Sequence, residues 1–229
     1  MHGKGKTVRR IRVKQLARHG AAELAILREA SAVVEEGMVR RMVEVREGLR
    51  TATRDLPYES DEYFELEEAE QGDRWVLQRI IQNMRRALFL AVWSVLEKKV
   101  EGVASLYQEA GPLAGKPCVC KGSAVERYWR RLESADLVSG DLVCRWRQLL
   151  RYQDPRNAVA HPPRPGRTER RRSAWIRLAE ETGTVTVDSS GAPDLGPEFN
   201  AHLIEQMSTW HHLLMRAVEE KEGRLPARQ

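Results

Sequence analysis

The chain has few cysteines, few aromatic residues and no long apolar run, and each shortage excludes a class of protein. Its 229 residues include three cysteines, an odd number that is too few for a disulfide framework. Phe, Trp and Tyr make up only 6% of the residues. The content of Gly and Pro is modest as well, and this composition argues against overall disorder. Mean hydropathy is −0.54. No stretch approaches the roughly 18 apolar residues of a membrane-spanning helix.

Motifs of nucleotide and metal chemistry are missing as well. There is no Gly-x4-Gly-Lys-Ser/Thr loop and no Gly-x-Gly-x-x-Gly, so the usual phosphate cradles are not predicted. Cys118, Cys120 and Cys144 would supply three thiolates, and no fourth zinc ligand is obvious. His211 and His212 are adjacent in the chain and cannot both face one point. We therefore expect neither a metal ion nor a cofactor.

The first residues are basic, but the apolar segment of a secretory signal does not follow them. Together with the lack of a spanning segment, this predicts a cytoplasmic protein without membrane contact.

Charge is distributed in blocks rather than evenly. Residues 4–18 contain seven basic side chains and no acid, whereas residues 59–73 contain eight acids and no base. Between residues 145 and 172, nine arginines face two acids. Basic clusters of this size are typical of proteins that bind RNA or DNA. A solvated surface explains any single block equally well.

The apolar pattern predicts an all-α fold, a helical bundle with one short β-hairpin. Apolar residues recur at steps of three and four over about 21–53, 74–109 and 197–222. Period-two alternation around Glu180–Gly183 predicts the hairpin, at about 174–188, before the last helix. The chain thus divides into a basic N-terminal arm (1–20), a helical extension (21–58), an acidic linker or short helix (59–73), the bundle (74–222) and a tail (223–229).

Capping residues predict where the helices begin and end. Asp73 is the expected N-cap of the helix over 74–109. Ser123 and Glu126 have the spacing of a capping box, and Asp141 is the expected cap of the next helix. Asp154 and the proline after it would start a further short helix, which has to end near His161 because two prolines follow.

The segment from Arg151 to His161 carries the most chemical information. A helix that ends at His161 places the negative end of its dipole there, which favours the imidazolium. Asn157 and His161 are four residues apart and share a face, so the amide could hold the imidazole in one tautomer. Arg156 is about 140° from His161 around the helix, within reach of a shared edge. An arginine to bind phosphate and a histidine to move a proton can split a phosphodiester without a metal ion.

Arg156, Asn157 and His161 resemble the Arg-x4–6-His motif of the HEPN family, in which Asn, Asp or His usually follows the arginine. The resemblance covers roughly residues 74–222, and Glu97 is the best match to an acidic residue that the family often carries in an earlier helix. It implies metal-independent RNA cleavage at a cleft between two protomers, each contributing one Arg–His pair. Many family members are bacterial toxins or antiviral effectors, which implies RNA, a second copy and a cognate antitoxin or defence-system protein as partners.

Four arginines around this segment are predicted to bind the RNA backbone: Arg151, Arg164, Arg167 and Arg170. Arg151 precedes the motif, and the other three lie in the basic stretch that follows His161. All four are expected to lie within reach of a scissile phosphate. One feature departs from the family. A subgroup of its toxins carries a modified tyrosine two residues after the histidine, and Pro163 stands at that position here.

Three other interpretations stay open. Arg156 could pair with an acid while His161 merely caps a helix. The chain could be a HEPN-like module without catalysis that binds nucleic acid or a protein. It could also regulate transcription through its basic arm, but no recognition helix stands out.

Overall fold

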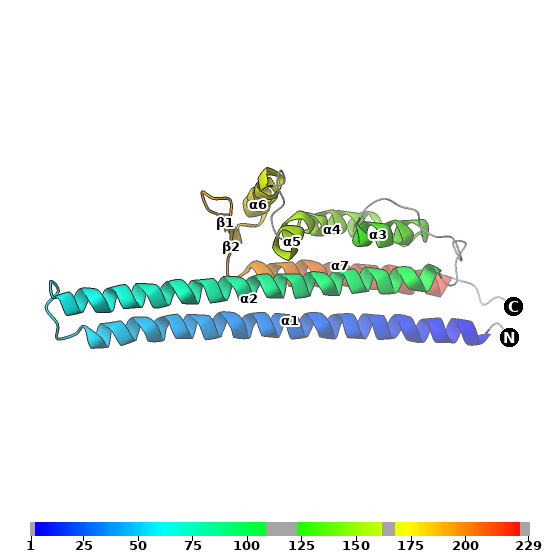
Figure 1. Ribbon diagram of the computed structural model, residues 1–229. Coiled ribbons are helices and arrows are strands. Elements are labelled where there is room, and N and C mark those ends of the chain that lie inside the picture. The colour runs from blue at the N-terminus through cyan, green and yellow to red at the C-terminus, as the bar shows by residue number, and fades with distance from the viewer. Residues whose placement is uncertain (1–2, 109–122, 162–167, 225–229) are drawn as a thin grey trace.

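The computed structural model describes residues 3–108, 123–161 and 168–224, and it confirms an all-α protein. Figure 1 shows two long helices side by side, with the shorter elements gathered along one half of their length. The elements are α1 (Gly3–Ala52), α2 (Asp61–Gln108), α3 (Ala124–Ser134), α4 (Gly140–Leu150), α5 (Gln153–Ala160), α6 (Thr168–Thr182), β1 (Val185–Val187), β2 (Pro193–Leu195) and α7 (Phe199–Arg224). Despite their length, no helix in the described ranges is apolar enough to cross a membrane.

The first helix begins earlier than predicted, because the basic arm belongs to it. α1 runs without a break through the predicted start at Ala21. Val13 is buried, and the Leu16 side chain lies against Gly102 of α2. The absence of a side chain at Gly102 lets the two helices approach closely there. Packing on α2, which the charge pattern does not reveal, therefore extends the helix into the basic block.

The acidic block is also helical, so the prediction that Asp73 caps a helix is wrong. α2 begins at Asp61, and the Ser60 hydroxyl accepts a hydrogen bond from the Tyr63 amide at 3.2 Å, as an N-cap does. Asp61 and Glu62 occupy the first turn, where the helix dipole favours acids. Asp73 lies inside this helix. Glutamates inside a helix are good helix formers, and their charge alone does not make a linker.

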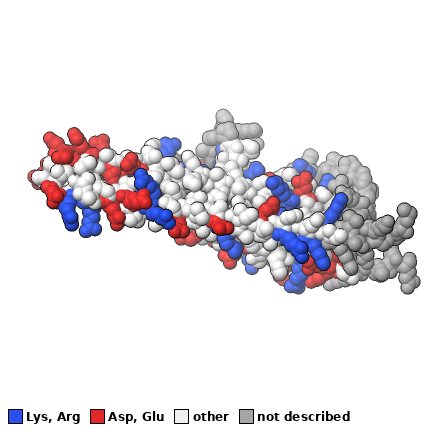
Figure 2. Space-filling view, turned by 90° about the horizontal axis from the view of Figure 1, so that it is seen from below, with Lys and Arg blue, Asp and Glu red and all other residues white. Residues whose placement is uncertain are grey.

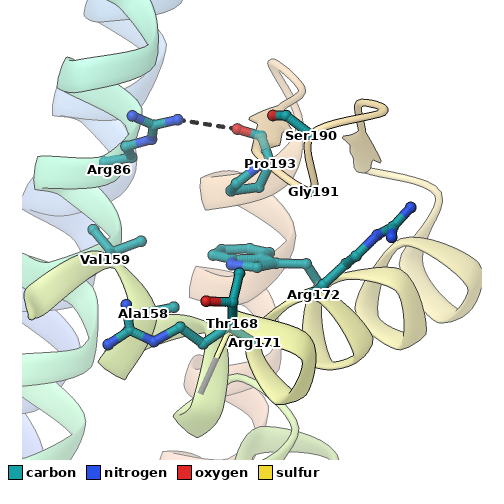
Figure 3. Close-up of a pocket in the computed structure, with 10 residues that line it drawn as sticks. Arg86, Ala158, Val159, Thr168, Arg171, Arg172, Ser190, Gly191 and Pro193 are labelled. Atoms are coloured by element: carbon teal, nitrogen blue, oxygen red, sulfur yellow. Dashed lines mark hydrogen bonds between the residues drawn. The ribbon is translucent and has the colours of Figure 1, made fainter. Parts of the chain in front are cut away.

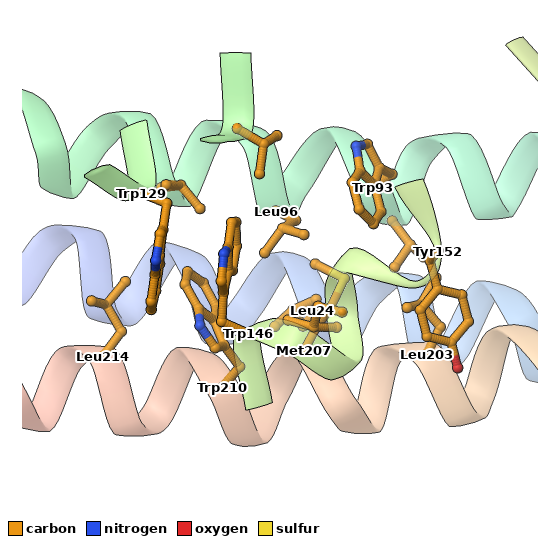
Figure 4. Packing of buried hydrophobic residues seen from close by; sticks show 14 of the residues in the cluster. Leu24, Trp93, Leu96, Trp129, Trp146, Tyr152, Leu203, Met207, Trp210 and Leu214 are labelled. Carbon is orange, nitrogen blue, oxygen red and sulfur yellow. The ribbon is translucent and has the colours of Figure 1, made fainter. Parts of the chain in front are cut away.

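Tryptophans form the centre of the core between α2, α3, α4 and α7 (Figure 4). The rings of Trp129 and Trp146 stack with centroids 4.5 Å apart and an interplanar angle of 7°. The Trp146 ring also packs against the Trp210 ring of α7, with the ring centroids 5.6 Å apart. All three side chains are buried. Because α3 and α4 are short, these large rings account for much of the area that holds them against the long helices.

The predicted hairpin is displaced along the chain. Residues 174–178 lie in α6, and the observed hairpin pairs β1 with β2, with Val185 opposite Leu195. Alternation at 174–178 is equally compatible with a helix, in which Trp175 and Leu178 are buried while Ile176 is exposed. Part of the basic stretch that follows His161 is likewise helical, because α6 begins at Thr168.

Side chains of α2 fix the hairpin in place. The Gln82 amide group both donates to the Leu195 carbonyl (3.0 Å) and accepts from the Leu195 amide (2.9 Å). Arg86 donates to the Pro193 carbonyl at 3.1 Å. Arg85 donates to the Leu195 carbonyl at 2.5 Å, and its other nitrogens form a two-pronged ion pair with Glu35 of α1. The bonds to Leu195 and Pro193 join the outer edge of β2 to α2, so the long helix holds the small sheet in place in addition to the pairing of its two strands.

Helix ends follow the sequence signals only in part. The capping box of Ser123 and Glu126 is present, and His161 is the C-cap of α5, as predicted. The predicted starts at Asp141 and Asp154 are each wrong by two residues, since Ser139 and Tyr152 are the N-caps of α4 and α5. Neither N-cap makes a side-chain hydrogen bond, so a search for capping side chains cannot find them.

His211 is buried where α7 meets α1, beside Gly20 and an ion pair between Lys99 and Glu23. Its Nε2 atom has no hydrogen-bond partner in the part of the chain that the structure describes. Burial, followed by the charges of Lys99 and His212, lowers the pKa of His211 from 6.5 to about 4, while Glu23 acts in the opposite direction. The imidazole is therefore neutral at neutral pH.

This pKa predicts a loss of stability in mild acid. Because the folded chain resists protonation of His211, the unfolded chain binds the proton first, and the free energy of unfolding falls as the pH drops from 6.5 to about 4. Urea titrations across this range should show a weaker pH dependence for His211→Gln than for the natural chain. His161→Gln, at an exposed histidine whose charge does not act on His211, should behave like the natural chain. Equal slopes for all three proteins would contradict the assignment.

Candidate nucleic-acid cleavage site

The candidate site is built on α5, a helix of two turns. Pro155 is buried in its first turn, and His161 follows the last helical residue with extended backbone angles (φ −128°, ψ 140°). The His161 amide still donates to the Asn157 carbonyl at 3.2 Å. The proline after His161 disfavours helical angles at that residue, so the sequence itself ends α5 there. His161 leaves the helix at its negatively polarised end.

Arg156 points towards α2 and contacts Glu97, the acid predicted to support the site. Its Nη2 atom lies 3.6 Å from a Glu97 carboxylate oxygen, and its Nη1 atom donates to the Asn157 side-chain oxygen at 3.1 Å. The other Glu97 oxygen accepts from the Trp93 indole at 3.1 Å. The structure thus brings together Arg156, Asn157 and Glu97. Both charged side chains keep some exposure, 24% for Arg156 and 33% for Glu97.

His161 lies on a different side of α5 from this ion pair. It is exposed and lines a cleft of about 500 Å³ with Asn157, Asp154 and Arg170. Arg156 does not line that cleft. Asn157 is the residue that the two groups share, and its oxygen is bonded to Arg156, so an orienting bond to the imidazole would use the amide nitrogen. Within one protomer, the arginine and the histidine therefore sit on adjacent surfaces.

Two of the four arginines predicted to bind RNA are paired with acids. Arg151 forms an ion pair with Glu181 of α6 at 2.8 Å. Arg170 forms one with Asp154 of α5 at 3.1 Å. Both pairs are largely exposed, so each contributes little stability and can be exchanged for another anion at small cost. Arg164 and Arg167 lie outside the described residues.

Sequence reasoning missed a second basic pocket on the other side of α5, shown in Figure 3. Ala158 and Val159 of α5 line it, together with three arginines from two helices and the turn of the β-hairpin. Ala158 and Arg171 belong to both this pocket and the His161 cleft, so the two hollows adjoin across the end of α5. Arg86 contributes from α2, some seventy residues earlier in the chain. That separation left no local signal in the sequence. The three arginines are Arg86, Arg171 and Arg172.

Metal ligands do not gather in the described part of the chain. There, no three His, Cys, Asp or Glu side chains lie close enough to hold a metal ion. Cys144 is an exposed free thiol, and Cys118 and Cys120 lie outside the described residues. Comparisons of the chain with protein-family models, with curated proteins and with solved structures gave no match. The similarity to HEPN domains therefore rests on the sequence motif alone.

Proposed function

We propose that this chain is a metal-independent endoribonuclease whose site surrounds the end of α5. The observation that carries the proposal is the position of His161, a titratable and exposed side chain in a cleft that Arg170 and Arg171 also line. RNA supplies both a phosphate for such a cleft and a 2′-hydroxyl for the imidazole. We place the activity in the cytoplasm, as a bacterial toxin or defence effector held in check by a cognate partner.

The proposed reaction is a transesterification in which the 5′ oxygen is the leaving group. The imidazole of His161 takes the proton of the 2′-hydroxyl, and the resulting oxygen attacks the adjacent phosphorus. The bond from phosphorus to the 5′ oxygen breaks, and that oxygen takes a proton from water, which the proton held by His161 then replaces. The products are a 2′,3′-cyclic phosphate and a 5′-hydroxyl, and no electron transfer or metal ion is required. Arg156 would offset the charge that develops on the phosphate oxygens.

The contact between Arg156 and Glu97 is compatible with this role. At 3.6 Å it is longer than a hydrogen bond, so the guanidinium is held chiefly by its bond to Asn157. The Nε atom of Arg156 also lacks a partner among the described residues. A phosphate can therefore replace Glu97 at Nη2 without breaking a strong bond. Glu97 then acts as a positioning residue that holds the arginine before RNA arrives.

The resemblance implies that two Arg–His pairs meet across a two-fold axis, and a mixing experiment tests this part of the proposal. Arg156→Ala and His161→Ala should each be inactive alone. If two chains build one site, an equimolar mixture should regain a measurable part of the natural activity, because mixed dimers contain one intact arginine and one intact histidine. A mixture as inactive as its components would show that chains do not share a site.

A second candidate function is a module that binds nucleic acid or protein without cleaving it. The ion pairs of Arg156, Arg151 and Arg170 favour this alternative, since paired arginines can serve the fold alone. It predicts RNA binding with no cleavage products, and unchanged binding after His161→Ala. Product analysis therefore separates the two functions directly.

A further inference from the structure

The exposed apolar side chains of this protein gather on the long hairpin formed by α1 and α2. In the described residues, every exposed large apolar side chain except Ile176 belongs to these helices or their link. Val76 and Ile80 of α2 keep 48% and 43% of their area exposed, and Ile26 and Val33 of α1 each keep 64%. Such a concentration marks an interaction surface more often than scattered single residues do.

Five of these side chains lie in two stripes, one on each helix, which alanines and a glycine complete with the same spacing of four, four, three and four residues. The five are Ile26, Val33, Val76, Ile80 and Met84. This spacing keeps every member on a single helix face and is the pattern of helices that pair in coiled coils and bundles. Every member but Ala30 is exposed, and Ala30 is half-buried. The α1 stripe is Ala22, Ile26, Ala30, Val33 and Gly37, and the α2 stripe is Val76, Ile80, Met84, Ala87 and Ala91.

Neighbouring elements leave this side of the hairpin uncovered. Within the described residues, α2 packs against α1, α3, α5, α7 and β2, and α1 packs against α2 and α7. The stripes lie on the side that remains, away from α7. Figure 2 shows the molecule from below, where acidic side chains gather at the tip of the hairpin with some basic side chains beside them. The alanines of both stripes, and the glycine of the α1 stripe, would let another pair of helices approach closely.

We propose that a second copy of this chain covers the two stripes, so that two long hairpins form an antiparallel four-helix bundle. A two-fold axis across the middle of the hairpins would place α1 against α1 and α2 against α2 of the second copy, each pair antiparallel. Both stripes lie towards the middle of helices about 75 Å long. A two-fold axis at that point places each stripe of one chain against the same stripe of the second chain.

Charge selects the antiparallel arrangement. The block of eight acids, residues 59–73, lies at the tip of the hairpin, and the block of seven bases, residues 4–18, lies at its other end. Antiparallel pairing places the acidic end of each copy beside the basic end of the other. Parallel pairing would bring like charges together at both ends, at a cost in binding free energy. An antiparallel dimer thus contains two contacts between an acidic block and a basic block, one at each end.

This surface does not include α5, so the inference is independent of the proposed nuclease function. The cleft of His161 stays open in the bundle. A chain that pairs both through the long hairpin and through α5 would form a tetramer, and one that pairs only through the hairpin would form a dimer. In either case, loss of the hairpin contact halves the assembly.

The test is the mass of the full-length chain in solution, measured by light scattering during size-exclusion chromatography. We expect the natural chain to have at least twice its 26.2 kDa mass, and Ile80→Glu with Ile26→Glu to halve the mass while the helical circular dichroism is unchanged. The control is Val43→Glu, at an exposed apolar residue outside the stripes, which should keep the natural mass. A natural chain that stays monomeric at high concentration, or a stripe variant of unchanged mass, would overturn the inference.

Orientation is tested by reversing charge at the tip. Glu62, Glu65 and Glu68 are exposed, and their joint replacement by lysine leaves the stripes intact. An antiparallel dimer should then dissociate at a concentration at least tenfold higher in low salt, with the difference narrowing as salt is added. An unchanged or tighter dimer would overturn the antiparallel arrangement. A natural chain that assembles as expected but cleaves no RNA would count against the proposed function alone.

Discussion

His161→Ala is expected to lower the rate of RNA cleavage by about 10²–10⁴-fold and to leave RNA affinity within a few-fold of the natural value. The imidazole is exposed at the end of α5, so its removal leaves no cavity in the core. Proton transfer acts in the transition state, whereas binding depends on contacts with phosphates that the variant keeps. Single-turnover cleavage and equilibrium binding on the same RNA would measure the two effects separately.

The matched control for this variant is His212→Ala, which removes another exposed imidazole, on α7. It should cleave at the natural rate. If His161→Ala cleaves normally, or if both variants lose activity together, then His161 is not the proton-transfer group.

Trp146→Ala is expected to destabilise the fold more than any other single change discussed. Trp146 is buried between Trp129 and Trp210 and joins α4 to α3 and α7. Truncation of such a side chain costs about 3–5 kcal/mol, which lowers the Tm of a domain of this size by about 10 °C. Thermal unfolding followed by circular dichroism measures the change.

Trp75→Ala provides the comparison, because Trp75 is 57% exposed on α2 and its ring contacts the Arg79 side chain. Its removal should shift the Tm by no more than about 2 °C, since exposed substitutions are usually close to neutral. Equal losses for the two variants would mean that the tryptophan stack is not the centre of the core.

The sequence was sufficient for the fold class and for the structure around α3 and α5, where the signals are local. The capping box at Ser123 and the prolines after His161 act on residues a few positions away, and both predictions are confirmed. The prediction of a strand at 174–178 was wrong because five residues are too few to distinguish the period-two pattern of a strand from the pattern of a helix. The sequence left the acidic block open between a linker and a short helix because its apolar periodicity does not decide, although a serine cap and glutamates favour a helix there.

The arrangement of the site could not be predicted from the motif. Spacing indicated that Arg156 and His161 lie on different sides of a helix, but the chain's path decides what each side meets. Arg156 meets Glu97, which lies fifty-nine residues earlier, and the second basic pocket needs Arg86 from the same long helix. Ion pairs such as that of Arg170 with Asp154 also depend on where α6 packs. Contacts across such sequence distances follow from tertiary packing, which no local pattern encodes.

The central claim is cleavage of RNA by the Arg156 and His161 chemistry, and the end groups of the products test it most directly. The purified chain would be incubated with mixed RNAs in EDTA, with the His161→Ala variant prepared in parallel. Products bearing a 2′,3′-cyclic phosphate and a 5′-hydroxyl, absent from the variant, are the predicted result. Products with 5′-phosphates, or cleavage that stops in EDTA and returns with Mg²⁺ or Mn²⁺, would contradict the account.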